Sequence, residues 1–549
     1  MATRRDFLKV AAGTTATMLL VACGGGDTDS AAPTTGTGST GDSGVGQSTP
    51  AGESTPGAGG STSETEIRTG GRLLDSLLSE PDSLDPHKGT LLVTTYVLNL
   101  LYDRLVYVDQ DRQPQPWLAE SWNVSDDGTR ITFTLREGVV FHDGTPLNAE
   151  AVKFTFDRLI DPATASPNAN QIGPLEGTEV IDEKTVELTW SEPYAPVFMM
   201  LAGSQMGIIS PTAVEKLGDQ FGRNPVGSGP FKLKRWDAGK ELLFERNPDY
   251  KNFRGDVQNP GAPYIDELSI RLVPEEGTRM AALESGELHL AWAPVQDVEN
   301  IRANPDLQIF AREKGTSWEY IEFNTTKPPF DDLAVRQAVG YALNPEEILI
   351  ASYIYGDLIK APLPIGTAGY DAEVGEQYGF TPDPEKAKSL LQGKTPVNAV
   401  LTTWNAPQAV RAAQVIQAQL QAVGINVELE TMDAGTFLAK LRESDFHFAF
   451  NRTTWPDPII LSQTFKSPGR DNQYSNPELD PVLEEIESTV DPKARQEAVS
   501  KAQRMLLEDA AVVPLFSDHF MMAGSKAVQG FFFSALGYPM YQDVWIAES

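Results

Sequence analysis

The segment from Ala409 to Leu429 changes from helical to strand periodicity across a single glycine. Apolar residues recur at helical spacing from Ala409 to Val423, and Gly424 ends this stretch. The next five residues, 425–429, alternate apolar and polar side chains as a strand does. A helix that ends at a glycine and leads into a strand is typical of an α/β unit. The sequence therefore predicts a mixed α/β fold.

Strand and helix patterns also alternate elsewhere in residues 67–549. Residues 129–136 alternate polar and apolar side chains after an Asp-Asp-Gly turn, which indicates a strand with one buried face. A helix is predicted over 148–157, because Asn148 provides an N-cap and apolar residues follow at i, i+3 and i+4 spacing. Two further helices are predicted, at 333–342 and 384–391.

The segment before residue 67 has a composition that cannot build a core. From Gly24 to Glu66 it consists almost entirely of Gly, Ser, Thr, Pro, Ala, Asp and Glu. It buries too little apolar surface to offset the entropy of ordering, so we expect residues 23–66 to be a disordered linker. At about 5–6 Å times the square root of its length, this linker would hold the folded body about 35 Å from its anchor on average.

Residues 1–22 have the features of an export signal. The pair Arg4 and Arg5 precedes an apolar stretch, 10–22, that is too short to span a bilayer. The arginine pair resembles a twin-arginine signal, and Leu-Val-Ala before Cys23 resembles the bacterial lipobox, in which the signal is cut before the cysteine. We therefore expect Cys23 to be lipidated and to anchor the chain to the cell membrane, in the periplasmic space or on the outer face of the cytoplasmic membrane.

The chain is strongly acidic, with 76 Asp and Glu residues against 44 Lys and Arg and a formal net charge of -32. This charge repels phosphate backbones, so a nucleic acid is not an expected partner. A length of 549 residues allows two or three domains. With one cysteine the chain forms no intramolecular disulfide, so burial alone must hold the fold.

The sequence contains no local catalytic motif. Phosphate loops, H-E-x-x-H, G-x-S-x-G and Cys/His ligand spacings are all missing. The five histidines are scattered, and Asp-Gly after His142 indicates that this imidazole braces a loop. They are His87, His142, His289, His447 and His519. We predict no enzyme activity, no metal and no cofactor. A pair of carboxylates that converges only on folding, as in a glycosidase, stays open as an alternative.

Six blocks of residues follow one another in a characteristic order after Gly70. The longest runs from Leu118 to Phe154 and includes Phe-His-Asp-Gly-Thr-Pro at 141–146. The other five are 81–86, 225–231, 246–250, 283–288 and 323–339. In sequence and order these blocks resemble the family 5 extracellular solute-binding proteins of the oligopeptide, dipeptide and nickel importers. The resemblance covers almost all of the folded body.

This resemblance implies a periplasmic-binding-protein-like α/β fold of class II, in which two lobes close on a ligand and the first lobe carries an extra domain. It places the base of the first lobe at 67–112, 223–292 and 516–549, the extra domain at 113–222 and the second lobe at 293–515. The closed form in this family docks on the permease subunits of an ABC importer, whose separate ATPase subunits supply the energy. A monomer is expected, because both lobes must move freely.

Family resemblance also bears on the ligand. In the peptide-binding members, an aspartate just upstream of an Asp-Pro pair binds the N-terminal ammonium of the peptide. Alignment on Asp457-Pro458 puts that position at Thr454, so the ammonium clamp is predicted to be missing, with Asp457 either a substitute or a turn residue. Residues 402–407 also lack the arginine that meets the peptide carboxylate in some dipeptide binders, and Arg411 would sit inside the helix.

Both of these loops instead place a tryptophan beside a small polar residue, Trp404 next to Asn405 and Trp455 next to Thr454. Flat aromatic faces beside hydrogen-bonding groups suit sugar rings or other neutral, partly apolar solutes. Trp318, on a strand that enters the cleft, adds a third face. Packing in the core or between the lobes is an equal alternative for any single tryptophan. Aromatic rings with Asp or Glu would also suit a cationic ligand.

The sequence therefore favours the extracytoplasmic substrate-binding component of an ABC importer, with an oligosaccharide or another neutral solute as ligand. An oligopeptide or dipeptide is the alternative ligand. A tethered extracellular sensor that uses the same cleft is the third hypothesis.

Overall fold

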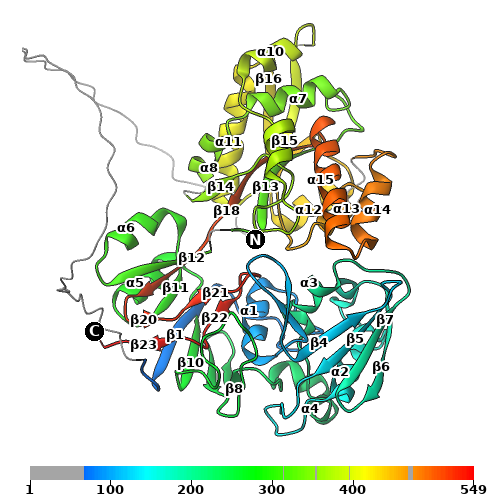
Figure 1. The fold of residues 1–549 in the computed structure, drawn as a ribbon. Coiled ribbons are helices and arrows are strands. Elements are labelled where there is room, and N and C mark those ends of the chain that lie inside the picture. The colour runs from blue at the N-terminus through cyan, green and yellow to red at the C-terminus, as the bar shows by residue number, and fades with distance from the viewer. Residues whose placement is uncertain (1–66, 313, 353–354, 395, 468–473, 549) are drawn as a thin grey trace, which may run out of the picture. The chain divides into compact units, whose positions relative to one another are not determined.

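The computed structural model describes residues 67–312, 314–352, 355–394, 396–467 and 474–548 (Figure 1). The predicted signal at 1–22, the lipidation site at Cys23 and the linker at 23–66 lie outside these residues.

A six-stranded mixed sheet, in the order β14-β18-β13-β17-β15-β16, organises the middle of the chain. Its strands are β13 (Ser317–Phe323), β14 (Gly356–Leu358), β15 (Val397–Trp404), β16 (Ile425–Met432), β17 (Phe448–Thr454) and β18 (Val512–Asp518). Strand β15 runs parallel to β16 and β17, whereas β13 is antiparallel to both of its neighbours. Every residue of β13 is buried, as expected of a central strand that is covered on both faces.

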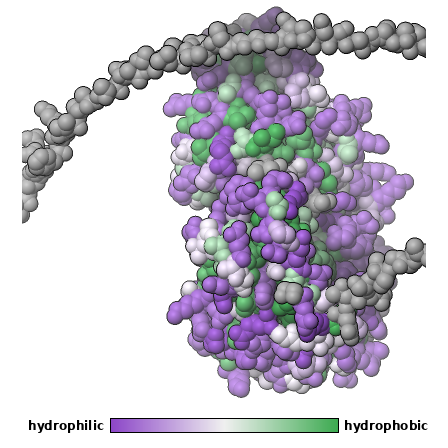
Figure 2. Space-filling view, turned by 90° about the vertical axis from the view of Figure 1, so that its left-hand side faces the viewer, coloured by the Kyte–Doolittle hydropathy of each residue, from purple (hydrophilic) through white to green (hydrophobic). Residues whose placement is uncertain are grey.

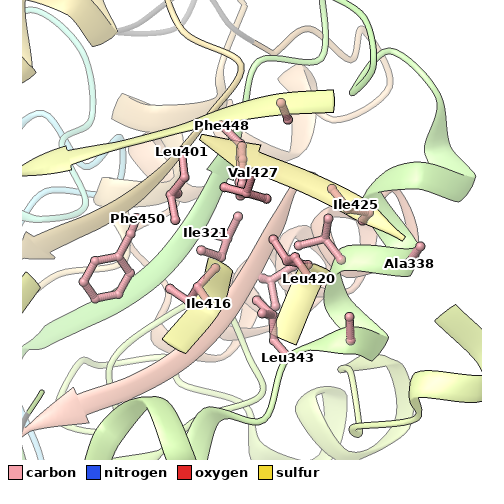
Figure 3. Packing of buried hydrophobic residues seen from close by; sticks show 14 of the residues in the cluster. Ile321, Ala338, Leu343, Leu401, Ile416, Leu420, Ile425, Val427, Phe448 and Phe450 are labelled. Carbon is pink, nitrogen blue, oxygen red and sulfur yellow. The ribbon is translucent and has the colours of Figure 1, made fainter. Parts of the chain in front are cut away.

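Helices cover both faces of this sheet. On one face Ile321 and Leu401 pack against apolar residues of α11, among them Ile416 and Leu420 (Figure 3). On the other face Trp318 and Tyr320 belong to a cluster with three helices near the C-terminus. The helices of the first face are α7 (Leu333–Ala342), α8 (Pro345–Ser352), α10 (Pro384–Leu390) and α11 (Pro407–Ala422); those of the second are α13 (Ile459–Phe465), α14 (Asp480–Ser488) and α15 (Pro492–Glu508). Two more helices in this part of the chain are α9 (Ala372–Tyr378) and α12 (Ala434–Arg442).

The local predictions of helices and strands are confirmed. The pattern at 409–429 forms α11, then Gly424, then β16, and α7 has the predicted bounds. Helix α2 (Ala149–Ile160) begins after Asn148, whose side chain accepts a hydrogen bond from the N–H of Ala151 at 3.2 Å. Strand β5 (Arg130–Leu135) alternates its burial as its polar and apolar residues alternate.

Two four-stranded sheets lie in the earlier part of the chain. The first has the order β1-β10-β9-β8 and consists of β1 (Arg72–Leu77), β8 (Phe231–Asp237), β9 (Glu241–Arg246) and β10 (Glu267–Leu272). The second, within the predicted extra domain, is antiparallel in the order β4-β5-β7-β6 and adds β4 (Ala119–Val124), β6 (Leu175–Asp182) and β7 (Thr185–Trp190) to β5. Besides α2, the helices in the described part of this half are α1 (Leu92–Leu101), α3 (Val197–Leu201), α4 (Pro211–Leu217), α5 (Glu276–Glu284) and α6 (Val298–Ala303).

Residues from both ends of the folded body share one core. Leu73 and Leu77 of β1 cluster with Val528, Tyr541 and Val544. These late residues surround short strands: β20 (Val528–Gln529) pairs with β23 (Trp545–Ile546), and β21 (Phe532–Phe533) pairs with β22 (Pro539–Met540). An early pair, β2 (Val106–Val108) with β3 (Pro114–Pro116), is also short. The first part of the fold is therefore complete only with the last residues of the chain.

Two strand connections join the six-stranded sheet to a three-stranded sheet of order β11-β19-β12. The strands of the smaller sheet are β11 (Leu290–Trp292), β12 (Leu307–Arg312) and β19 (Phe520–Ser525). Strand β12 leads into β13, and β18 leads into β19 across His519 alone. The smaller sheet thus contains strands from both sides of the predicted boundary at residue 293. It also places the ends of β12 and β18 close to the junction between the two sheets.

His142 braces a loop, as its Asp-Gly turn predicts. Its ring Nε2 lies 3.0 Å from the carbonyl oxygen of Gly229, and its backbone N–H donates to the carbonyl oxygen of Gly227 at 2.8 Å. Gly227 cannot carry a side chain, because a Cβ there would lie 2.0 Å from the carbonyl oxygen of Leu101. Two of the sequence blocks, 118–154 and 225–231, are thus conformationally linked parts of the scaffold.

The exposed surface reflects the acidic composition of the chain. On the face seen in Figure 2, hydrophilic residues predominate and hydrophobic residues form smaller patches among them. No helix in the described part of the chain combines the length and the apolar character needed to cross a bilayer.

Candidate ligand-binding site

A cavity of about 470 Å³ lies where segments far apart in the sequence meet. One part of its wall consists of residues of α1 and of residues 199–205. Another part consists of the end of β12, the residue before β13 and the end of β17. Residues 520 and 536–538 also belong to the wall. Its aromatic lining residues are Tyr96, Trp455, Phe520 and Tyr538. Among the described lining residues, the charged ones are Arg312 and Arg452. The cavity therefore offers apolar rings and positive charge.

Strand register brings Thr454 and Trp455 to this cavity. Strands β13 and β17 pair with Ser317 opposite Thr454, so the end of β17 lies beside the start of β13. The N–H of Trp455 then donates to the carbonyl oxygen of Thr316 at 3.1 Å. The side chain of Thr454 is exposed and that of Trp455 is half-buried. Both side chains line the cavity, as residues at the edge of a sheet can.

The opposite wall carries two tyrosines on rigid supports. The ring of Tyr96 in α1 stacks on Trp292, with 5.3 Å between ring centroids. The hydroxyl of Tyr538 accepts a hydrogen bond from the N–H of Ser204 at 3.2 Å. Burial raises the pKa of Tyr96 well above its usual range, so its hydroxyl stays neutral and able to donate.

Arg452 connects two buried carboxylates beside the cavity. Its Nη2 lies 2.7 Å from Oδ2 of Asp518, and its Nε lies 3.0 Å from Oε1 of Glu319. Asp518 also accepts a hydrogen bond from the hydroxyl of Ser317. Burial raises the pKa of Glu319 well above its usual range, and Asp518 adds to this shift while Arg452 opposes it. These groups fix the position of Arg452 at the junction of the two sheets.

Arg312 forms no ion pair with a carboxylate among the residues that the structure describes. Its Nη2 donates to the carbonyl oxygen of Ala535 at 3.0 Å, and its Nη1 donates to Oγ1 of Thr316 at 3.4 Å. Its side chain is buried, with 9% of the residue exposed, and burial lowers its pKa to about 10. A Cβ at Gly537 would lie 2.2 Å from Nη1 of Arg312, so a larger residue there would displace the end of this guanidinium.

Two of the predicted tryptophans are not among the residues that line this cavity. Trp318 is 1% exposed, and its ring stacks on Tyr320 with 4.0 Å between centroids. Trp404, half-buried at the end of β15, stacks on Phe450 at 5.6 Å. Their contacts are those of core residues.

The two remaining predicted residues occupy different settings. Asn405 is exposed, and its N–H donates to the carbonyl oxygen of Met432 at 2.8 Å. Asp457 is 1% exposed and forms an ion pair with Arg495, with Oδ1 2.6 Å from Nη2. Its Oδ1 also accepts a hydrogen bond from the N–H of Ile459 at 2.9 Å, as in a turn before a helix. Asp457 lines another cavity, of about 380 Å³.

Sequence reasoning missed most of the cavity wall. Arg452 stands two residues before Thr454, so a basic residue beside the position of the missing ammonium clamp was a usable signal. Arg312, Tyr96 and Tyr538 lie in no motif, and only the fold brings them together. Among the described residues, no group of three or more His, Cys, Asp and Glu side chains could hold a metal ion.

Comparisons with known proteins agree with this architecture. The model of the bacterial extracellular solute-binding proteins, family 5 (middle region), matches residues 113–473. The glutathione-binding protein GsiB of Shigella flexneri is 33% identical over 470 residues, which cover 82% of this chain and 89% of that protein.

Solved structures resemble the fold over nearly the whole folded body. HbpA2 from Haemophilus parasuis matches with a TM-score of 0.77 and 25% identity, covering 87% of this chain and 100% of the other. DppA from Helicobacter pylori, in complex with the peptide STSA, matches with a TM-score of 0.70 and 26% identity, covering 88% and 99%. The fold is thus that of the two-lobed periplasmic binding proteins, and the chain belongs to family 5 of the bacterial extracellular solute-binding proteins.

Proposed function

We propose that this chain is the lipid-anchored receptor of an ABC importer and that it takes a peptide-like solute into the cavity of about 470 Å³. The observation that carries this proposal is the cavity wall, which draws Tyr96 and Tyr538 from one part of the fold and Trp455 from the end of the six-stranded sheet. A solute held between such walls would lose its water on all sides, so each of its polar groups needs a partner there. Relatives that bind glutathione or a peptide support a peptide-like ligand.

An oligosaccharide or another neutral solute is the second candidate. Trp455 favours it, because a half-buried indole in the cavity beside the exposed Thr454 offers an apolar face next to a hydrogen-bonding group. The charge of Arg312 favours the peptide-like solute instead, since a neutral sugar gains little from a guanidinium.

The remaining parts of the proposal concern the setting of the receptor. A lipid on Cys23 would hold the chain at the membrane, the linker 23–66 would give it reach, and the monomer would deliver its solute unchanged to the permease. No chemical step on the solute belongs to this role, so the protein acts as a binder and not as an enzyme. The domain bounds given in the sequence analysis belong to the same proposal.

Native mass spectrometry of the purified chain, followed by thermal unfolding with short peptides and with oligosaccharides, tests the ligand class. A solute that binds only the folded state raises the melting temperature by mass action. Stabilisation by peptides supports the first candidate, and stabilisation by oligosaccharides alone supports the second. Replacement of Cys23 by serine should release the protein from the membrane fraction, and retention there would contradict the lipid anchor.

A further inference from the structure

A second cavity, of about 740 Å³, adjoins the candidate site through a shared residue. Arg312 lines both cavities. The second cavity also contains Arg112 and Lys314, and Asp111 is the acidic residue among its described lining. Three cations against one carboxylate is an unusual balance in a chain that carries 76 acidic and 44 basic residues.

The two arginines converge on one uncharged acceptor. Arg112 donates through Nη1, and Arg312 donates through Nη2, to the carbonyl oxygen of Ala535. Within the described residues neither guanidinium forms an ion pair, although a guanidinium has five N–H donors. Burial lowers the pKa of Arg112 to about 9, and the nearby charge of Arg312 adds to this shift. A half-buried and a buried guanidinium thus share one carbonyl, and within the described residues no carboxylate lies within ion-pair distance of either.

The backbone of Arg112 adopts a strained conformation. Arg112 has a φ of 61°, in the left-handed region that non-glycine residues rarely adopt. The turn between β2 and β3 enforces it: the N–H of Arg112 donates to the carbonyl oxygen of Asp109 at 3.0 Å, and the N–H of Gln113 donates to Oδ1 of Asp109 at 2.9 Å. A strained residue that presents a charge to a cavity is typical of a binding site.

Apolar residues make up much of the remaining wall. Ile309 and Phe310 of β12 line the cavity together with Phe531 and Phe533. Aromatic and aliphatic walls suit the carbon skeleton of an organic molecule and offer nothing to a free inorganic anion. Guanidinium groups bind planar carboxylates through paired N–H donors.

We infer that Arg112 and Arg312 bind a carboxylate of the transported solute, which is therefore an organic acid. The inference rests on the proposed function, because a solute in the first cavity reaches the pair through the shared Arg312. Lys314, exposed on the rim, adds positive charge along the approach. The ligand class thus becomes a peptide-like or other organic solute with at least one free carboxylate.

The test uses the full chain, thermal unfolding and glutarate as the probe, with its neutral diamide glutaramide at the same ionic strength. Glutarate should raise the melting temperature in a concentration-dependent way, and glutaramide should not. Arg312→Gln and Arg112→Gln should each weaken the apparent affinity for glutarate by about tenfold or more. Arg112→Lys keeps the charge and should retain part of the response. Arg302→Gln, at an exposed arginine that lines neither cavity, is the matched control and should respond as the wild type does.

Several results would overturn the inference. They are no stabilisation of the wild type by glutarate, equal stabilisation by glutaramide, or an undiminished response in both glutamine variants. Equal stabilisation by inorganic phosphate would replace the organic acid with a general anion site.

A second measurement separates this inference from the function on which it rests. Native mass spectrometry identifies the solute that copurifies with the full chain. A neutral solute that is bound equally by the wild type and by Arg112→Gln would overturn the carboxylate site and leave the receptor role intact. Glutarate binding that depends on Arg112, with solute uptake unaffected by loss of the chain, would overturn the importer role and leave the site intact.

Discussion

The guanidinium of Arg495 donates two hydrogen bonds to the carboxylate of Asp457, from Nη2 to Oδ1 at 2.6 Å and from Nη1 to Oδ2 at 3.0 Å. The side chain of Asp457 is 2% exposed and that of Arg495 14%. A carboxylate held in this way has little capacity left for a ligand ammonium. The pair joins the turn before α13 to α15, which makes it part of the scaffold of the six-stranded half.

Asp457→Ala should therefore lower the free energy of unfolding by about 3 kcal/mol, because it leaves a largely buried guanidinium without its carboxylate partner. Urea unfolding measures this change. The double variant Asp457→Ala with Arg495→Met should recover part of the loss. A variant with unchanged stability and weaker ligand binding would instead identify Asp457 as a ligand contact.

Trp318→Ala should also act on stability. The indole is 1% exposed and stacks on Tyr320, so its removal leaves a cavity in the core and should cost about 3–5 kcal/mol. Ligand affinity, measured by calorimetry on the folded protein, should stay within a few-fold of the wild type. A large loss of affinity at unchanged stability would contradict the core position.

Trp455→Ala should have its main effect on binding. A half-buried indole in the wall of the ligand cavity supplies contact area of the kind that dominates binding, and truncation should cost about 2 kcal/mol of binding free energy. Titration calorimetry with the solute found by mass spectrometry measures this loss. Trp404→Ala is the comparison, since Trp404 stacks on Phe450 and should leave the affinity nearly unchanged.

Asp75 should make stability depend on pH. It accepts a hydrogen bond from the hydroxyl of Tyr541 at 2.6 Å, and burial raises its pKa from 3.8 to about 6. A carboxyl with a raised pKa in the folded state contributes stability below its unfolded pKa and loses it as the pH rises through the folded pKa. Relative to Asp75→Asn, the wild type should therefore lose about 2–3 kcal/mol between pH 4 and pH 7. A stability difference independent of pH would exclude this titration.

Gly227→Ala should destabilise the fold through a backbone collision. The new Cβ would lie 2.0 Å from the carbonyl oxygen of Leu101, and overpacking of this kind costs about 1–3 kcal/mol or more. Gly177→Ala is the matched control, because a Cβ there meets nothing within 4 Å. Equal melting temperatures of the two variants would show that the 225–231 loop can shift.

The sequence predicts the parts of this fold that depend on local periodicity. Helix α7 and the helix, glycine and strand succession at 409–429 follow from side-chain spacing, and the structure has them where the pattern indicates. The family follows from the order of short blocks, which turn out to be scaffold contacts such as those of His142 with Gly227 and Gly229.

The cavity wall could not be predicted in this way. Trp318 and Trp455 look alike in the sequence, but the pleat of β13 directs Trp318 into the cluster with α13, α14 and α15, whereas Trp455 follows the end of β17. Arg112 and Arg312 are 200 positions apart, and nothing local marks either one. Their proximity depends on the pairing of strands that are far apart in the sequence. The spacing of neighbouring side chains carries no information about that pairing.

The core shared by Leu73, Leu77 and Val544 also determines how this protein is made. All strands of the six-stranded sheet have been synthesised by residue 518, so that half can assemble while translation continues. The core around β1 has no such opportunity, because its members Val528, Tyr541 and Val544 are synthesised only after that sheet. The part of this core that Val528, Tyr541 and Val544 cover therefore stays exposed until the six-stranded sheet has been made, and a truncation before Val528 would leave it uncovered.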